Sequence, residues 1–212
     1  MKILVVAATQ LETQPFINLK NNTGVLISGV GIPSTVYHLT KKLLHEKYDV
    51  VIQAGIAGTF SKKIKKGEVV VVEQDAFGDI GFEEKREFKT IFQLGFSDKN
   101  TFPFKNGTLV NASEIVTIKH LKKVNGVTVN KISDRKKQAR QLKEIFNADV
   151  ESMEGAAFHF VCLQQNIPFL QLRSISNKVG ERDKTKWNLI EAIANLNREL
   201  IDLVDLINKQ CS

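Results

Sequence analysis

The sequence predicts one α/β domain of three layers, with helices on both faces of a mixed, largely parallel central sheet. The chain has 212 residues, of which 42% are hydrophobic, and this is enough for one well-buried core. Apolar runs of strand length recur along the chain, and segments with helical periodicity separate several of them. Glycines flank many of these segments, as in folds that alternate strands with helices. We therefore expect a single domain over residues 1–212.

The predicted strands are the apolar runs that few polar residues interrupt. Runs of this kind are typical of strands that are buried in a sheet. In chain order they cover Ile3–Ala8, Val25–Ser28, Val50–Ala54, Glu68–Val72, Leu109–Val110, Val127–Val129 and Phe169–Ile175.

The predicted helices are the segments whose apolar residues recur with helical spacing. They cover Thr35–Glu46, Glu114–Lys122, Arg135–Phe146, Glu154–Gln165 and Trp187–Asn208. Start signals support three of them, because Pro33 with Ser34, Ser113 and Asp134 stand where a helix begins.

The segment Gln74–Asn106 has neither strand nor helix periodicity. It carries Phe77, Phe82, Phe88, Phe92, Phe96, Phe102 and Phe104 among charged residues. Long irregular segments of compact domains are often functional or interfacial. Two interpretations remain open at this point: a satellite core, or a substrate lid or subunit contact.

Charge and cysteine content restrict the class of protein. The net charge is +7, but no recognition motif for nucleic acid accompanies it, so nucleic-acid binding is disfavoured. Cys162 and Cys211 have no metal-ligand or redox spacing, and Cys162 falls in an apolar run where a buried thiol is expected. The first apolar run ends at Thr9, too early for a signal peptide or a membrane span. We expect a cytoplasmic protein that binds no metal and no membrane.

The candidate chemical groups lie in the last third of the chain. Glu154 and Arg173 bracket one predicted helix and one predicted strand, and Ser176 and Asn177 follow that strand. In such folds the helix start and the strand end share the carboxyl edge of the sheet, where ligands bind. Taken alone, Glu154 could merely compensate a helix dipole and Asn177 could be a turn residue.

Several motifs occur in a defined order over nearly the whole chain. They are MKILVVAA with Glu12, SGVG at Ser28–Gly31, AGIAG at Ala54–Gly58, GEVVVVE at Gly67–Glu73, MEGAA at Met153–Ala157 and RSISN at Arg173–Asn177. The ordered set resembles the superfamily of nucleoside phosphorylases and nucleosidases, which includes methylthioadenosine/adenosylhomocysteine nucleosidase. The resemblance implies cleavage of an N-glycosidic bond without a metal or an organic cofactor.

The resemblance also implies roles for individual residues. Glu12 is the expected general base for water, and Arg173 is expected to position that glutamate or the water. Glu154 is expected to hydrogen-bond the ribose hydroxyls, Met153 to pack against the sugar, and Asn177 to face the purine. The further expected substrate contacts are Ser176, Ile56, Ala57, and the backbone of Lys131 and Ile132. Breaking such a bond builds positive charge on the sugar and negative charge on the base, so each needs a partner.

The nucleophile is predicted from the stretch that contains AGIAG. Related phosphorylases, which this chain also resembles at Gly29–Ser34, carry an arginine and a serine there for phosphate. Here the corresponding positions are Gln53 and Ile56. A neutral amide and an apolar side chain do not supply an anion site, so water is the expected nucleophile.

The base is predicted from Asn177, because methylthioadenosine nucleosidases have an aspartic acid at this position. An amide donates to the O6 atom of a 6-oxopurine and accepts from a protonated N7, whereas a carboxyl group suits adenine. The mismatch costs on the order of 10⁴ in specificity for a site built around polar groups. Hypoxanthine or guanine is therefore the expected leaving group.

A final motif, VGERDKTKW at Val179–Trp187, resembles the futalosine hydrolase group of this superfamily, as does the segment Asp75–Glu84. Futalosine is an inosine derivative with a benzoate-containing chain at the 5′ end. Arg182 or Lys184 could bind that carboxylate or be ordinary surface residues, and Trp187 could anchor the last helix. The expected reaction releases hypoxanthine on a route to menaquinone.

Several alternatives remain beside this interpretation. Within the superfamily they are a purine nucleoside phosphorylase and a methylthioadenosine nucleosidase. Outside enzymes they are an inert nucleoside-binding sensor and a basic nucleic-acid-binding protein. Proteins of this superfamily are commonly dimers or larger, so a homo-oligomer with a small-molecule substrate is expected.

Overall fold

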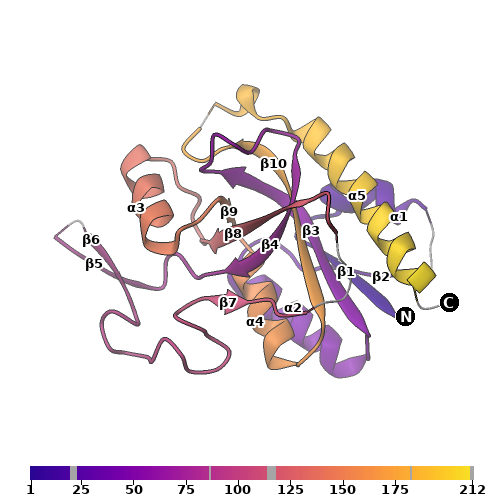
Figure 1. Ribbon diagram of the computed structural model, residues 1–212, viewed down its shortest axis with the longest axis horizontal. Coiled ribbons are helices and arrows are strands. Elements are labelled where there is room, and N and C mark those ends of the chain that lie inside the picture. The colour runs from indigo at the N-terminus through magenta and orange to yellow at the C-terminus, as the bar shows by residue number, and fades with distance from the viewer. Residues whose placement is uncertain (20–22, 86, 114–117, 182, 211–212) are drawn as a thin grey trace.

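The computed structural model describes residues 1–19, 23–85, 87–113, 118–181 and 183–210. In this part of the chain, helices lie on both faces of one large sheet, and a hairpin projects from its side (Figure 1). The helices are α1 (Gln10–Ile17), α2 (Ile32–His45), α3 (Lys136–Phe146), α4 (Gly155–Gln164) and α5 (Leu189–Gln210). The strands are β1 (Ile3–Ala7), β2 (Gly24–Ile27), β3 (Val50–Thr59), β4 (Val69–Asp75), β5 (Gly81–Glu84), β6 (Glu87–Thr90), β7 (Leu109–Val110), β8 (Lys122–Thr128), β9 (Val150–Ser152) and β10 (Phe169–Lys178).

Two apolar cores hold the layers together. On one face of the sheet, Phe16 of α1 and Leu196 of α5 pack with Ile52 of β3. On the other face, Leu39 of α2 and Phe158 of α4 form the second core with β1 and β3. Every residue of β1 is buried, as expected for a strand that is covered on both faces. The predicted three-layer α/β fold is therefore confirmed.

The large sheet is mixed and partly closed on itself. Its order is β10-β4-β8-β9-β3-β1-β2, with β7 beside β4 and an additional pairing between β10 and β3. Strand β3 pairs with β1 through Val50–Gln53 and with β9 through Gly58–Thr59. Because β3 and β10 are ten residues long, each can pair with different strands along its length. Their pairing with each other closes β10, β4, β8, β9 and β3 into a ring of strands.

The carboxyl ends of several strands meet at one edge of the sheet. Strands β1, β2, β3 and β10 run parallel to one another. The segment after β1 enters α1, and the segment after β2 enters α2 at Gly31. Strand β9 leads into α4, whose N-cap residue is Glu154. The motifs expected to carry the chemistry therefore gather at this edge.

The element boundaries differ from the sequence prediction in several places. Strand β3 runs to Thr59 rather than ending at Ala54, and β8 begins at Lys122 rather than at Val127. The helix predicted over Glu114–Lys122 is wrong for its described part, because Lys122 begins strand β8; residues 114–117 lie outside the described residues. Strand β10 runs to Lys178 rather than ending at Ile175. The prediction missed α1, β9 and the β5–β6 hairpin, which are short or lack alternating burial.

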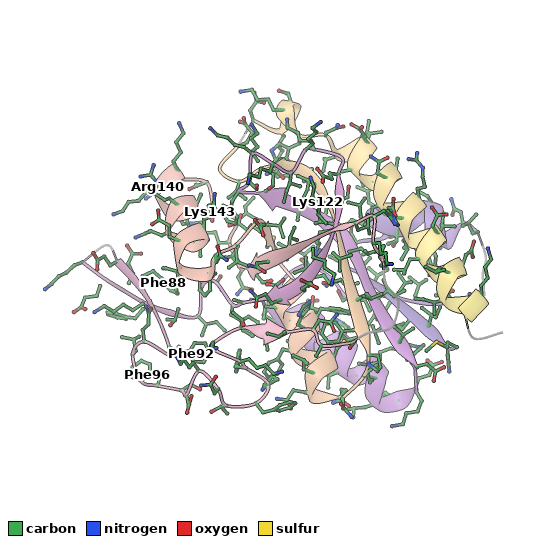
Figure 2. All side chains as sticks on the ribbon, in the orientation of Figure 1. Phe88, Phe92, Phe96, Lys122, Arg140 and Lys143 are labelled. Atoms are coloured by element: carbon green, nitrogen blue, oxygen red, sulfur yellow. The ribbon has the colours of Figure 1, made fainter. Side chains whose placement is uncertain are left out.

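The phenylalanine-rich excursion between β4 and β7 is partly a satellite core. The ring of Phe104 contacts those of Phe77, Phe92 and Phe160 of α4, and Phe77 also contacts Phe160. A cavity of about 250 Å³ lies among these rings. Figure 2 labels Phe88, Phe92 and Phe96 along this excursion, on the side of the molecule that carries the hairpin. Phe82, Phe96 and Phe102 remain exposed to solvent.

No helix in the described residues is both long enough and apolar enough to cross a membrane. Cys162 is buried with a free thiol, as predicted; Cys211 lies outside the described residues.

Candidate active site

Glu12 lies in the first turn of α1 with both carboxylate oxygens engaged. Oε2 accepts the backbone N–H and the hydroxyl of Thr9, each at 3.0 Å. Oε1 accepts the backbone N–H of Ile56 at 3.1 Å. Thr9 and Glu12 form a capping box, which satisfies the free N–H groups at the helix start. The side chain is therefore fixed between α1 and strand β3.

Glu154 is held at the start of α4 by a different loop. Its Oε1 accepts the backbone N–H of Gly31 at 3.0 Å. Gly31 has a φ of 90°, a conformation that glycine adopts without the strain other residues would incur. The loop between β2 and α2 thus brings its amide to a carboxylate that lies far away in the sequence.

Arg173 lies between these two glutamates. It is 1% exposed, its Nη2 donates to Oε1 of Gln53 at 2.8 Å, and its Nη1 contacts the carbonyl of Ile56 at 3.5 Å. Nη1 lies 3.7 Å from Oε2 of Glu154, too far for a hydrogen bond but close enough for electrostatic attraction. The backbone of Ile56 therefore links Glu12 and Arg173.

The electrostatics of the site centre on Glu154. Burial raises the pKa of the Glu154 carboxyl, the positive charge of Arg173 opposes that rise, and the negative charge of Glu12 adds to it. A carboxylate with few water partners needs ligand hydroxyls to satisfy its oxygens. The arrangement can bind a polyhydroxylated ligand beside a second carboxylate that is able to accept a proton.

Ser176 and Asn177 lie near the carboxyl end of strand β10, at the same edge of the sheet. Ser176 Oγ contacts the carbonyl of Ala57 at 3.3 Å and Oδ1 of Asn177 at 2.7 Å. The Asn177 Nδ2 donates to the Lys178 carbonyl at 2.9 Å. The amide group is therefore oriented locally, and each of its polar atoms keeps capacity for one further hydrogen bond.

The remaining predicted contacts are less closely grouped. Ala57 is buried and Met153 is half-buried beside Glu154 in sequence. Lys131 and Ile132 are exposed, on the loop before α3. Arg182 lies outside the described residues. The structure thus brings together Glu12, Ile56, Glu154 and Arg173, and leaves the role of Lys131 and Ile132 a prediction.

A layer of buried polar side chains beneath α4 was not predicted. It contains Asp75, His159 and Gln171. Burial raises the pKa of Asp75 to about 6 and lowers the pKa of His159 to about 4. His159 and Gln171 lie between apolar residues and Asp75 follows two other polar residues, so the sequence gave no sign that three polar groups from β4, α4 and β10 would meet.

Comparison with known proteins places the chain in a family. Residues 14–208 match the model of the phosphorylase superfamily, which is most of the chain. The chain belongs to the phosphorylase superfamily. Among curated members, the futalosine hydrolase of Thermus thermophilus is 29% identical over 197 residues, covering 89% of this chain and 86% of that protein. The aminodeoxyfutalosine nucleosidase of Campylobacter jejuni is 29% identical over 194 residues, covering 87% of this chain and 80% of that protein.

Solved structures of a futalosine hydrolase and of a nucleosidase have the same fold. The native structure of futalosine hydrolase of Helicobacter pylori superposes with a TM-score of 0.79 at 20% identity, covering 97% of each chain. A Helicobacter pylori 5′-methylthioadenosine/S-adenosylhomocysteine nucleosidase, solved with butyl-thio-DADMe-Immucillin-A, gives a TM-score of 0.80 at 20% identity, covering 97% of this chain and 98% of that chain.

Proposed function

We propose that this protein hydrolyses the N-glycosidic bond of a 6-oxopurine nucleoside, and that the substrate is futalosine, which yields hypoxanthine and dehypoxanthinylfutalosine. The observation that carries the proposal is the meeting of Glu12, Arg173 and Glu154 at strand β3. The relatives named futalosine hydrolase, matched over most of the chain, support this choice of substrate. The reaction belongs to menaquinone biosynthesis.

In the proposed mechanism the two glutamates have different tasks. Glu154 accepts hydrogen bonds from the ribose hydroxyls and lies near the sugar as positive charge develops there. Glu12 deprotonates the water that attacks the anomeric carbon. Arg173 positions Glu12 or the attacking water, and Met153 packs against the sugar.

Water is favoured over phosphate by the environment of Arg173. A phosphorolytic site needs free cationic or hydroxyl donors for its anion. The Nη2 atom of Arg173 instead donates to Gln53 at 2.8 Å. In addition, Ile56 offers an apolar side chain and a backbone that is already bonded to Glu12.

The leaving base is assigned through Asn177. Its amide can donate to O6 and accept from a protonated N7, while Ser176 fixes its orientation. Ala57, Lys131 and Ile132 complete the proposed substrate contacts, and Arg182 is proposed for the carboxylate end of futalosine.

The domain organisation, the cellular location and the oligomeric state are also part of the proposal. We infer one domain over residues 1–212, a cytoplasmic location and a homodimer or larger assembly. Apolar side chains on the outer face of α2 support an assembly, since Tyr37 is 61% and Leu44 is 68% exposed and their spacing puts both on one side of the helix.

The test is base release by purified protein from futalosine, inosine and methylthioadenosine, each with and without phosphate. Rapid, phosphate-independent release of hypoxanthine from futalosine is the expected result. Phosphate-dependent cleavage of inosine would instead make the protein a phosphorylase. Cleavage of methylthioadenosine alone would contradict the role of Asn177, and no cleavage of any nucleoside would favour a sensor.

A further inference from the structure

A buried carboxylate beneath α4 has no part in the proposed chemistry. Asp75, the last residue of β4, is 1% exposed. Its Oδ1 accepts the Thr128 hydroxyl at 2.9 Å and the Ala76 N–H at 2.8 Å. Its Oδ2 accepts Nε2 of Gln171 at 3.2 Å. Burying a carboxylate costs free energy even when hydrogen bonds offset part of the cost. The presence of Asp75 at this buried position therefore needs a structural or functional reason.

The first link leads from Asp75 to the start of α4. Thr128 Oγ1 accepts the backbone N–H of Ala156 at 2.7 Å while its hydroxyl proton points to Asp75. The N–H groups of a first helical turn have no partner within the helix, and a negative charge near them is favourable. Glu154 is the N-cap of this helix. The position of the Glu154 backbone therefore depends on the contact between Thr128 and Asp75.

Gly155 shows how closely the helix start approaches this carboxylate. A Cβ atom added to Gly155 would collide with Oδ2 of Asp75 and Nε2 of Gln171. Only glycine permits this approach directly after Glu154. The first turn of α4 thus rests on Asp75 and Gln171.

The second link leads from Asp75 to Arg173. Gln171 and Arg173 are two residues apart on β10, so their side chains lie on the same face of the strand. The positive charge of Arg173 also lowers the pKa of Asp75, against the larger effect of burial. Asp75 is therefore a further buried carboxylate that interacts electrostatically with Arg173, in addition to Glu12 and Glu154.

We propose that Asp75 is a positioning residue of this site, which aims Glu154 through Thr128 and the first turn of α4 and acts on Arg173 through its charge. The inference rests on the proposed function, because it assumes that Glu154 binds the ribose hydroxyls. With Glu154 fixed in this way, its oxygens stay available for the sugar rather than pairing directly with Arg173.

The test measures how strongly the enzyme prefers futalosine to its 2′-deoxy analogue, as a ratio of kcat/KM values. This preference depends on Glu154, and Glu154→Gln sets its lower limit. Thr128→Val removes the hydroxyl that connects the helix to Asp75, and Thr128→Ser restores it. Asp75→Asn keeps an acceptor for Thr128 but removes the charge beside Arg173.

We expect Thr128→Val to lower the preference by about tenfold, as for loss of a hydrogen bond to a charged group, and Thr128→Ser to recover it. Asp75→Asn should lower the preference as well. The control is Asp149→Asn, in which a half-buried carboxylate that accepts the Asn125 N–H at 3.1 Å is changed away from α4. A purely structural role would lower the Tm or the yield of active enzyme and leave the preference unchanged.

An unchanged preference in both Thr128→Val and Asp75→Asn, with wild-type hydrolysis intact, would overturn the positioning role alone. Failure of the wild type to cleave futalosine would overturn the proposed function. In that case the same preference is measured as a ratio of Kd values by calorimetry, where it still decides the role of Asp75. Absence of both cleavage and binding would overturn the two together.

Discussion

At the scale of single residues, the proposed general base can be separated from substrate binding. Glu12→Gln keeps the size of the side chain and one carbonyl oxygen for the Ile56 N–H, which Glu12 accepts at 3.1 Å. An amide cannot take a proton from water, so turnover should fall by about 10²-fold or more, with substrate binding still measurable. Rates and calorimetric Kd values check this, and unchanged turnover would remove Glu12 from the role of base.

The side chain of Asn177 tests base recognition. Asn177→Asp replaces the amide donor with a carboxylate, which repels O6 of hypoxanthine and loses the hydrogen bond from Nδ2 to the Lys178 carbonyl. Activity on 6-oxopurine nucleosides should drop by about tenfold or more. The comparison is kcat/KM for futalosine and inosine in the two proteins. A variant with full activity on both nucleosides would contradict the assignment.

Asp75 and His159 should give opposite pH dependence to folding stability. Burial raises the pKa of Asp75 to about 6. Its contribution to the free energy of unfolding is therefore complete below pH 4 and is lost as the pH rises through 6. Burial lowers the pKa of His159 to about 4. Its contribution to the free energy of unfolding is therefore present above pH 6.5 and is lost as the pH falls through 4. Asp75→Asn removes only the first effect.

The stability of Asp75→Asn relative to wild type should therefore increase from pH 4 to pH 6, by on the order of 3 kcal/mol. Urea unfolding at a series of pH values measures this difference. The same variant is expected to lose activity, so stability and function would change in opposite directions. A difference that does not vary with pH would show that Asp75 titrates normally.

At the residue level, the sequence motifs indicated residues that lie together in the structure, whose roles stay predictions, but nothing in the sequence indicated the buried polar layer. Glu12, Glu154 and Arg173 stand in recognisable motifs and meet in the structure. Asp75 and Gln171 lie in strands whose pairing decides whether they touch. No pattern within either strand contains that information.

At the scale of elements, α1 depends on α5 for its completion. Asn197 of α5 accepts the Phe16 N–H at 3.0 Å and donates to the Glu12 carbonyl at 2.8 Å. These two backbone groups would otherwise bond to each other within the helix. The amide of Asn197 is thus inserted into the hydrogen-bond ladder of α1.

Asn197→Leu should lower the free energy of unfolding by about 2–4 kcal/mol, because two buried backbone groups lose their partner. It should also reduce kcat more than it raises KM, since the backbone of Glu12 shifts. Denaturant unfolding and steady-state kinetics give both values. Asn195→Leu is the matched control, because Asn195 donates to the Gly67 carbonyl instead; equal effects of the two variants would argue against a role for α1.

The long helices were predictable, whereas several short elements were not, although the short strands β2 and β7 were predicted. Helices α2, α3, α4 and α5 lie within a few residues of their predicted ranges, because their apolar periodicity extends over several turns. Helix α1 has eight residues with Pro15 inside, and β9 has three residues. Such segments are stabilised by tertiary contacts rather than by their own sequence pattern.

At the scale of the whole molecule, the proposed assembly makes a prediction about mass. One chain has a mass of 23.8 kDa, and light scattering should give about twice this value or a higher multiple for the wild type. Leu44→Asp places a charge on the exposed apolar face of α2 and should lower the mass toward that of one chain. Ile190→Asp is the control, as Ile190 is also strongly exposed but lies on α5.

If wild type and both variants have the mass of a single chain, the proposed assembly is wrong. If Ile190→Asp lowers the mass and Leu44→Asp does not, the contact lies on α5 instead of α2. The three-layer architecture itself was predictable from alternating strands and helices. The closure of the sheet was not, because it depends on β3 exchanging β1 for β9 partway along its length.

The insertion of Asn197 into α1 has a consequence for how the protein matures during synthesis. Phe16 and Asn197 are 181 residues apart, so nearly the entire chain must leave the ribosome before the helix that carries Glu12 can be completed. The nascent protein can bury most of its sheet earlier, since domains begin to fold as they emerge. The active site would then be completed late in synthesis, in a single step, when helix α5 docks. Partly synthesised chains would be unable to cleave nucleosides.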